Sequence, residues 1–276
     1  MKQKKRSVRS PTSNLLPEGS LSPQSSPASV RCGNGKGCSP RFAAIDVLRG
    51  GAVALMVAYH FCFDLNYYGW MQANFNGAPF WLMSRAVIVS LFLGVAGISL
   101  VLSNRNAIDW RAWLRRFGIL AGCAALVSAS SYALFPRSWI FFGVLHFIAI
   151  ASVLGLAFLR WPRLDLAMGI ILVVVGLTVE LPLFDQPGLQ WLGLMTYKPI
   201  TEDYVPLLPW FGVVLIGLFL GRLALREKRL APVMAWRPKG VAGRSLAFAG
   251  RHSLPIYMLH QPLLMGALYL LKLLAH

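Results

Sequence analysis

Three ionisable residues lie in one long apolar run near the start of the chain. Arg49 is followed eleven residues later by His60, and Asp64 lies four residues beyond that histidine. Side chains four residues apart meet on one face of a helix, so the Asp64 carboxylate is expected to accept the Nδ1 proton of His60. That bond would fix the tautomer and leave Nε2 as a base. The alternative is that His60 and Asp64 have only a structural role.

The composition indicates that this run crosses a membrane. The 276 residues are 56% hydrophobic and 13% charged, whereas a soluble domain carries about 25% charged residues. Ionisable groups inside a bilayer cost roughly 2.5–3.5 kcal/mol each, and there they commonly mark a functional site. Apolar runs of bilayer-spanning length predict an all-α, polytopic transmembrane helical bundle of about seven spans. The predicted spans are 46–66, 79–103, 114–135, 139–159, 165–183, 206–225 and 253–274.

The positions of the basic residues predict the orientation. All but four of the 27 Lys and Arg residues fall in the N-terminal segment and in alternate loops. The four exceptions are Arg85, Arg137, Lys198 and Lys272. The positive-inside rule therefore predicts a cytoplasmic N-terminus and an outside C-terminus. The net charge of +17 is then a topology signal with a contribution from contact with anionic membrane lipids, and no nucleic-acid partner is expected.

Residues 1–40 differ from the rest of the chain. They are basic and rich in Ser, Pro and Gly, which predicts a disordered cytoplasmic tail ahead of a membrane domain at 41–276. Cys32 and Cys38 lack the usual zinc spacing, and Cys62 and Cys123 lie in apolar runs. No metal site is expected.

Two further histidines can be placed by depth. His60 lies roughly 21 Å from the inner face, and His146, counted from the outer face, lies roughly 10 Å deep, so the two reach a similar level. His260 lies roughly 10 Å from the inner face and is followed by Gln261 and Pro262. Both have structural alternatives: a bond from His146 to a neighbouring helix, and packing of His260 around a proline kink.

Charged and aromatic residues mark both ends of the predicted bundle. Arg49, Arg251 and His252 cluster at the inner surface, where they can bind phosphate or simply reach lipid headgroups. Asp46 can cap the first helix or pair with Arg49. An outer loop carries Asp203, Tyr204 and Trp210, which fits either sugar contact or membrane anchoring.

Four sequence blocks resemble the heparan-α-glucosaminide N-acetyltransferase family of membrane acyltransferases. They are Arg-Phe-Ala-Ala-Ile-Asp-Val-Leu-Arg-Gly at 41–50, Gly-Val-Leu-His-Phe-Ile-Ala at 143–149, Asp-Tyr-Val-Pro-Leu-Leu-Pro-Trp-Phe-Gly at 203–212, and Gly-Arg-His-Ser-Leu-Pro-Ile-Tyr-Met-Leu-His-Gln-Pro at 250–262. The likeness covers residues 41–276. An Arg followed by ten residues and a His is also shared with the broader membrane acyltransferase group, in which the His is taken as catalytic and the donor is an acyl-coenzyme A.

The resemblance implies a membrane-bound, acetyl-CoA-dependent N- or O-acyltransferase that acts on an extracytoplasmic sugar or glycan. His60, Asp64 and His146 would be catalytic. Arg49, Arg251, His252, His260 and Gln261 would bind the donor, and Asp203, Tyr204 and Trp210 the acceptor. The chain is shorter than the family's lysosomal enzyme, which favours a small bacterial, inner-membrane member with another acceptor; a homodimer is left open.

Two other readings of the same residues stay open at this point. His60, Asp64 and His146 could form the proton relay of a proton-coupled transporter, although no inverted repeat is visible. A non-catalytic membrane scaffold would use the histidines only to join helices.

Overall fold

The computed structural model describes residues 42–105 and 107–274, so the predicted tail lies outside the described residues. The described residues form α-helices and short 3-10 helices and contain no strand, which agrees with the predicted all-α class. The α-helices are α1 (Ala43–Tyr67), α2 (Pro79–Ser103), α3 (Trp110–Leu134), α4 (Val144–Phe158), α5 (Asp165–Thr178), α6 (Leu207–Arg226), α7 (Ala231–Ala235), α8 (Val241–Arg251) and α9 (Ser253–Leu274). The 3-10 helices are η1 (Pro182–Asp185), η2 (Gln190–Leu192) and η3 (Lys228–Leu230).

Five of these helices, α1, α2, α3, α6 and α9, are long and apolar enough to cross a membrane. Helices α4 and α5 are apolar but have only 15 and 14 residues, so they are shorter than the predicted spans 139–159 and 165–183. Pro182 prevents α5 from reaching the predicted bound at 183, because the residue before a proline is disfavoured in helical conformation. Seven spans and the orientation of the termini stay predictions.

Glycine residues allow several helices to pack with their backbones in contact. A Cβ atom on Gly50 of α1 would overlap the carbonyl oxygen of Leu246 in α8, and one on Gly250 would overlap the carbonyl oxygen of Asp46. Helices α2 and α6 meet in the same way at Gly97 and Gly217. Lipid tails are as apolar as leucine, so close backbone packing replaces the hydrophobic effect as the force that joins membrane helices.

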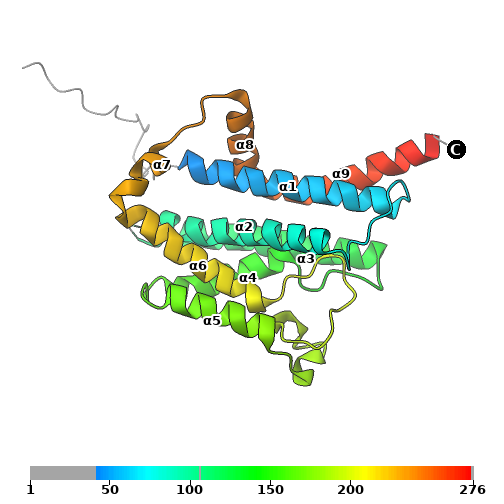
Figure 1. Cartoon of the computed structure of the whole chain (residues 1–276), viewed down its shortest axis with the longest axis horizontal. Helices are drawn as coiled ribbons and strands as arrows, with labels where there is room; N and C mark the ends of the chain where they lie inside the picture. The colour runs from blue at the N-terminus through cyan, green and yellow to red at the C-terminus, as the bar shows by residue number, and fades with distance from the viewer. Residues whose placement is uncertain (1–41, 106, 275–276) are drawn as a thin grey trace, which may run out of the picture. The chain divides into compact units, whose positions relative to one another are not determined.

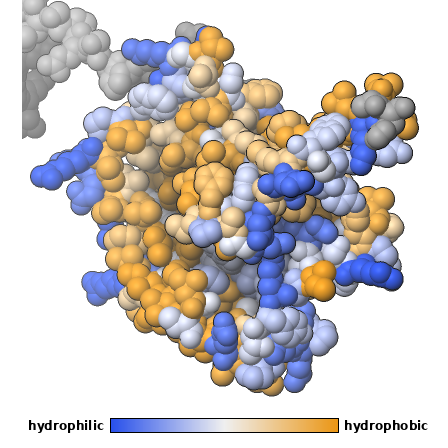
Figure 2. All heavy atoms as spheres, turned by 45° about the vertical axis from the view of Figure 1, so that its right-hand side comes forward, coloured by the Kyte–Doolittle hydropathy of each residue, from blue (hydrophilic) through white to orange (hydrophobic). Residues whose placement is uncertain are grey.

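The largest buried apolar cluster lies among α2, α4 and α6, and includes Leu93, Phe147, Leu215 and Leu218. Figure 1 shows α2 next to α6, with α5 beyond α6 and α1 on the other side of α2. Large apolar side chains are also exposed in quantity, and Figure 2 shows them over much of one face. Such a surface suits contact with lipid.

Two ends of the helix bundle can be defined by their polar residues. One end, called here the Arg222 end, holds an ion pair of 3.0 Å between Arg222 of α6 and Asp165 of α5. The Asp165 side chain is fully buried. Arg222 also donates to the carbonyl of Phe158, the last residue of α4. The Asp203 end holds the segments 135–143 and 179–206. The sequence analysis missed the buried pair because its partners lie in different predicted spans.

Helix α8 was not among the predicted elements. It is short, amphipathic and contacts α1 extensively, and its last turn lies beside Asp46 and Gly50. Helix α9 continues from it alongside α1, so Gly250 and His260 face α1 at the levels of Gly50 and His60.

Candidate active site

His60 lies in the second half of α1 with its tautomer fixed by its own helix. Its Nδ1 is 2.9 Å from the carbonyl oxygen of Met56. A carbonyl oxygen only accepts hydrogen bonds, so Nδ1 carries the hydrogen and the neutral ring presents a lone pair at Nε2. The Nε2 base was expected, but the predicted bond to Asp64 is wrong, because the Met56 carbonyl is the partner of Nδ1.

His260 of α9 faces His60 edge to face, with 4.9 Å between the ring centroids. The depth predicted for His260, well below His60, is therefore wrong. That prediction assumed that the first and last spans begin at the same depth. Gly250, just before α9, instead packs against Gly50, which lies several residues inside α1, so α9 begins further along α1 than was assumed. His260 Nδ1 lies 2.6 Å from the carbonyl oxygen of Tyr257, so it too keeps Nε2 free of hydrogen when neutral.

Asp64 is fully buried and bonded to α9 instead of to His60. Its Oδ1 accepts a hydrogen bond of 2.7 Å from Nε2 of Gln261. Its Oδ2, the Oε1 of Gln261 and the Nε2 of His260 are buried without a hydrogen-bond partner among residues 42–105 and 107–274. Helices α1 and α9 thus join through a polar seam that pairs His60 with His260 and Asp64 with Gln261. Buried polar atoms without partners are rare and commonly mark a working site.

His146 belongs to a separate cluster on the first turn of α4. Its Nδ1 accepts from the backbone N–H of Gly143 at 3.3 Å, and its Nε2 lies 3.1 Å from Ser128 Oγ in α3. The Ser128 hydroxyl donates to the Ile140 carbonyl, so it accepts from the imidazole. Both ring nitrogens are therefore used within the protein. No hydrogen bond or ring contact joins His146 to His60 in the described part of the chain, and the structural alternative, a bond to a neighbouring helix, describes it.

The residues predicted to bind a sugar are tied into the protein. Asp203 Oδ2 accepts from the backbone N–H of Val144 and from the Tyr257 hydroxyl, both at 2.9 Å. The Tyr204 hydroxyl donates to the Gln190 carbonyl at 2.6 Å, and burial raises the pKa of this phenol, which keeps it a donor. Trp210 is partly buried against the α2–α4–α6 cluster. These contacts order the Asp203 end, and acceptor binding by these residues stays a prediction.

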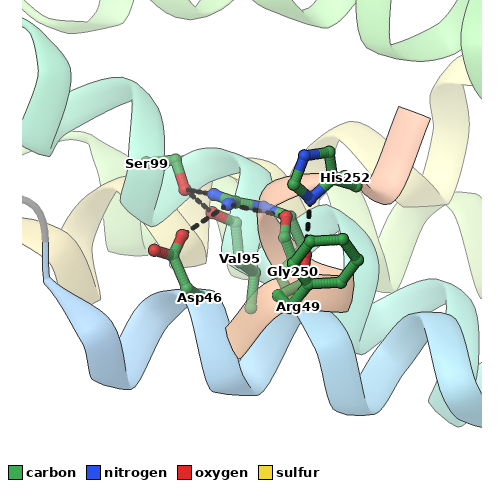
Figure 3. Close-up of polar contacts among 7 residues, drawn as sticks. Asp46, Arg49, Val95, Ser99, Gly250 and His252 are labelled. Atoms are coloured by element: carbon green, nitrogen blue, oxygen red, sulfur yellow. Dashed lines mark hydrogen bonds and ion pairs between the residues drawn. The ribbon is translucent and has the colours of Figure 1, made fainter. Parts of the chain in front are cut away.

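Arg49 makes a three-way tie at the Arg222 end (Figure 3). Its guanidinium donates to Asp46 Oδ1 at 3.2 Å and to Ser99 Oγ at 2.5 Å, so the predicted Asp46–Arg49 pair is confirmed. A third bond of 3.4 Å reaches the Gly250 carbonyl. Arg49 thereby joins α1 to α2 and α8, and phosphate binding by it stays a prediction.

Arg251 and His252 are exposed at the junction of α8 and α9. His252 Nδ1 lies 3.0 Å from the Phe248 carbonyl oxygen, and its ring lies against the Phe248 ring. Both side chains are exposed, and His252 lines the same apolar pocket as His260 of the polar seam. Donor binding by Arg251 and His252 stays a prediction.

A cavity of about 200 Å³ lies among α2, α3, α4 and α6. Polar residues line one part of it: Ser103, Asn104, Asp109 and Arg116, all near the end of α2 or the start of α3. Its opposite part is apolar and includes Leu93, Phe147 and Val214. The sequence analysis did not identify this cavity, because most of its polar residues lie at helix ends and Ser152, in the middle of α4, carries no charge.

Comparison with known proteins adds one finding to this geometry. The family model described as "Heparan-alpha-glucosaminide N-acetyltransferase, catalytic" matches residues 41–262. The matched range contains both members of each pair in the polar seam. No curated protein and no solved structure matches the chain.

Proposed function

The chain belongs to the heparan-α-glucosaminide N-acetyltransferase catalytic family, and we propose that it moves an acetyl group from acetyl-CoA to an amine or hydroxyl of a sugar or glycan. Its family and its apolar helices make it a multi-pass membrane acetyltransferase. We place the reaction at His60. The observation that carries this assignment is the fixed tautomer, which presents Nε2 as a base beside a second imidazole.

The proposed reaction is direct transfer. His60 Nε2 takes a proton from the acceptor amine or hydroxyl, whose nitrogen or oxygen attacks the thioester carbon. The new C–N or C–O bond forms as the C–S bond breaks, and the coenzyme A thiolate leaves and is then protonated. Asp64 and Gln261 do not touch His60 in this scheme. They hold α9 against α1, so that the imidazole environment stays fixed.

The cavity among α2, α3, α4 and α6 is one candidate for the donor's pantetheine arm, although none of its lining residues belongs to α1 or α9. Ligand pockets commonly measure about 300–1,000 Å³, so a cavity of about 200 Å³ suits a slender arm and not a whole nucleotide. Arg116 at its polar part can meet phosphate. By the charge pattern of the loops this end faces the cytoplasm, where acetyl-CoA is made, and the acceptor approaches from the Asp203 end.

The test is transfer of labelled acetyl from acetyl-CoA to a panel of amino sugars and glycans by the purified protein in liposomes. We expect label transfer by the wild type and its loss in His60→Ala, because the base is removed. Cys62→Ala, on the same helix, should keep activity. A fully active His60→Ala protein would rule out the assignment of the base. Label that stays on the denatured protein without acceptor would instead indicate an acetyl-His60 intermediate. Proton-driven uptake without transfer would favour a transporter.

A further inference from the structure

Tyr257 is hydrogen-bonded through its hydroxyl to Asp203 and through its backbone carbonyl to His260. Its hydroxyl donates to Asp203 Oδ2 at 2.9 Å, and its carbonyl accepts from His260 Nδ1 at 2.6 Å. Its ring also lies 5.7 Å from the His260 ring. One residue of α9 thus connects a carboxylate of the segment before α6 with the imidazole that faces His60.

Asp203 is itself fixed from a second side. The same Oδ2 accepts from the N–H of Val144, the first residue of α4. Gly143 makes this approach feasible, because a Cβ atom there would overlap the carboxylate. The Tyr257 hydroxyl therefore reaches a group that is anchored to a helix start, and this anchor limits the movement of the first turns of α9.

The His260 ring is held by the backbone of its own helix. Its Nε2 has no hydrogen-bond partner in the described part of the chain, and its Nδ1 bonds to the backbone at Tyr257, at 2.6 Å, and at Ile256. The edge-to-face packing of the His260 ring against the His60 ring therefore depends on where the backbone of Tyr257 lies.

We propose that Tyr257 is a positioning residue, which holds His260 against His60 by anchoring the first turns of α9 to Asp203. The inference rests on the proposed acetyl transfer at His60. The Tyr257 hydroxyl touches neither donor nor acceptor in this scheme. It acts on the rate through His260, and it leaves the binding of acetyl-CoA unchanged.

The test compares Tyr257→Phe with Tyr68→Phe in the acetyl-transfer assay. Tyr68 also donates from its hydroxyl to α9, to the Met265 carbonyl at 3.1 Å, but beyond the histidine pair. A hydrogen bond to a charged group is worth about a factor of ten or more, so we expect kcat of Tyr257→Phe to fall about tenfold. KM for acetyl-CoA should stay constant, and the pH profile of kcat should move, because the surroundings of His60 change. Tyr68→Phe should retain the wild-type kcat and pH profile.

A double-mutant cycle with His260→Gln shows whether Tyr257 acts through His260. We expect Tyr257→Phe to lower kcat no further in the His260→Gln protein. Independent, multiplying losses would overturn the proposal, as would a Tyr257→Phe protein whose kcat and pH profile match those of Tyr68→Phe. An inactive wild type would instead refute the proposed function itself. If Tyr257→Phe does not accumulate in the membrane, Asp203→Asn, which weakens the same bond by removing its charge, should lower kcat and move the pH profile in the same direction.

Discussion

Replacing Gly50 with alanine should disrupt the contact that places α8 and α9 on α1. The new Cβ atom would overlap the Leu246 carbonyl oxygen and lie 2.7 Å from its carbon and 3.1 Å from the Gly250 nitrogen. Nonbonded heavy atoms pack best at about 3.5 Å or more, so the two helices must separate by roughly 1.5 Å. All three neighbours are backbone atoms, so no side chain can rotate away to relieve the overlap.

Two opposing effects set the magnitude. Overpacking costs about 1–3 kcal/mol, and alanine in place of glycine returns up to about 1 kcal/mol in helix propensity. Because the overlap is with backbone atoms, the overpacking cost should lie near the top of its range, and we expect Gly50→Ala to lower the free energy of unfolding by a net of about 2 kcal/mol. Because a misplacement of about 1 Å can cost about a hundredfold in rate, acetyl transfer should fall more steeply than stability.

Gly51 provides the matched control, because a Cβ atom there meets nothing within 4 Å. Gly51→Ala should therefore be neutral or stabilising and keep full activity. The assays are the thermal unfolding midpoint in one detergent and acetyl transfer in liposomes. A Gly50→Ala protein as stable and active as Gly51→Ala would refute the reasoning.

Two further perturbations test the ties at the Arg222 end. Arg222→Met leaves the fully buried Asp165 without its cation and should destabilise the protein by about 3–5 kcal/mol, whereas adding Asp165→Leu should restore most of the unfolding midpoint. Ser99→Ala removes one partner of Arg49 and should cost about 1 kcal/mol in the same assay, with acetyl transfer retained. Loss of transfer in Ser99→Ala at an unchanged midpoint would contradict a purely structural role for this tie.

Local sequence patterns predicted those features that depend on nearby residues. Apolar runs indicated α1, α2 and α6 within a few residues, and the spacing of Asp46 and Arg49 indicated their ion pair. Helix α8 was not predicted because it is short and amphipathic. A search for long apolar runs does not detect such a helix.

The site could be predicted only in part. His60 stood out as an ionisable group in an apolar run, but its neighbours come from distant parts of the chain. Gln261 is separated from Asp64 by 197 residues, and Tyr257 from Asp203 by 54. The depths were counted in residues from a common starting level for all spans. The contact between Gly50 and Gly250 shows that the first and last spans begin at different levels.

The exposure of α9 has a consequence for how the protein is handled. After Gln261, Leu268 is the only buried residue of this helix within the described range, and in Figure 1 α9 extends past the end of α1. In the proposed membrane orientation, lipid acyl chains would surround most of its second half. The bilayer would then support the far half of the helix that carries His260, and bilayer thickness and acyl-chain order would affect the reaction. Transfer rates should respond to the chain length of the host phospholipid even at constant donor and acceptor concentrations.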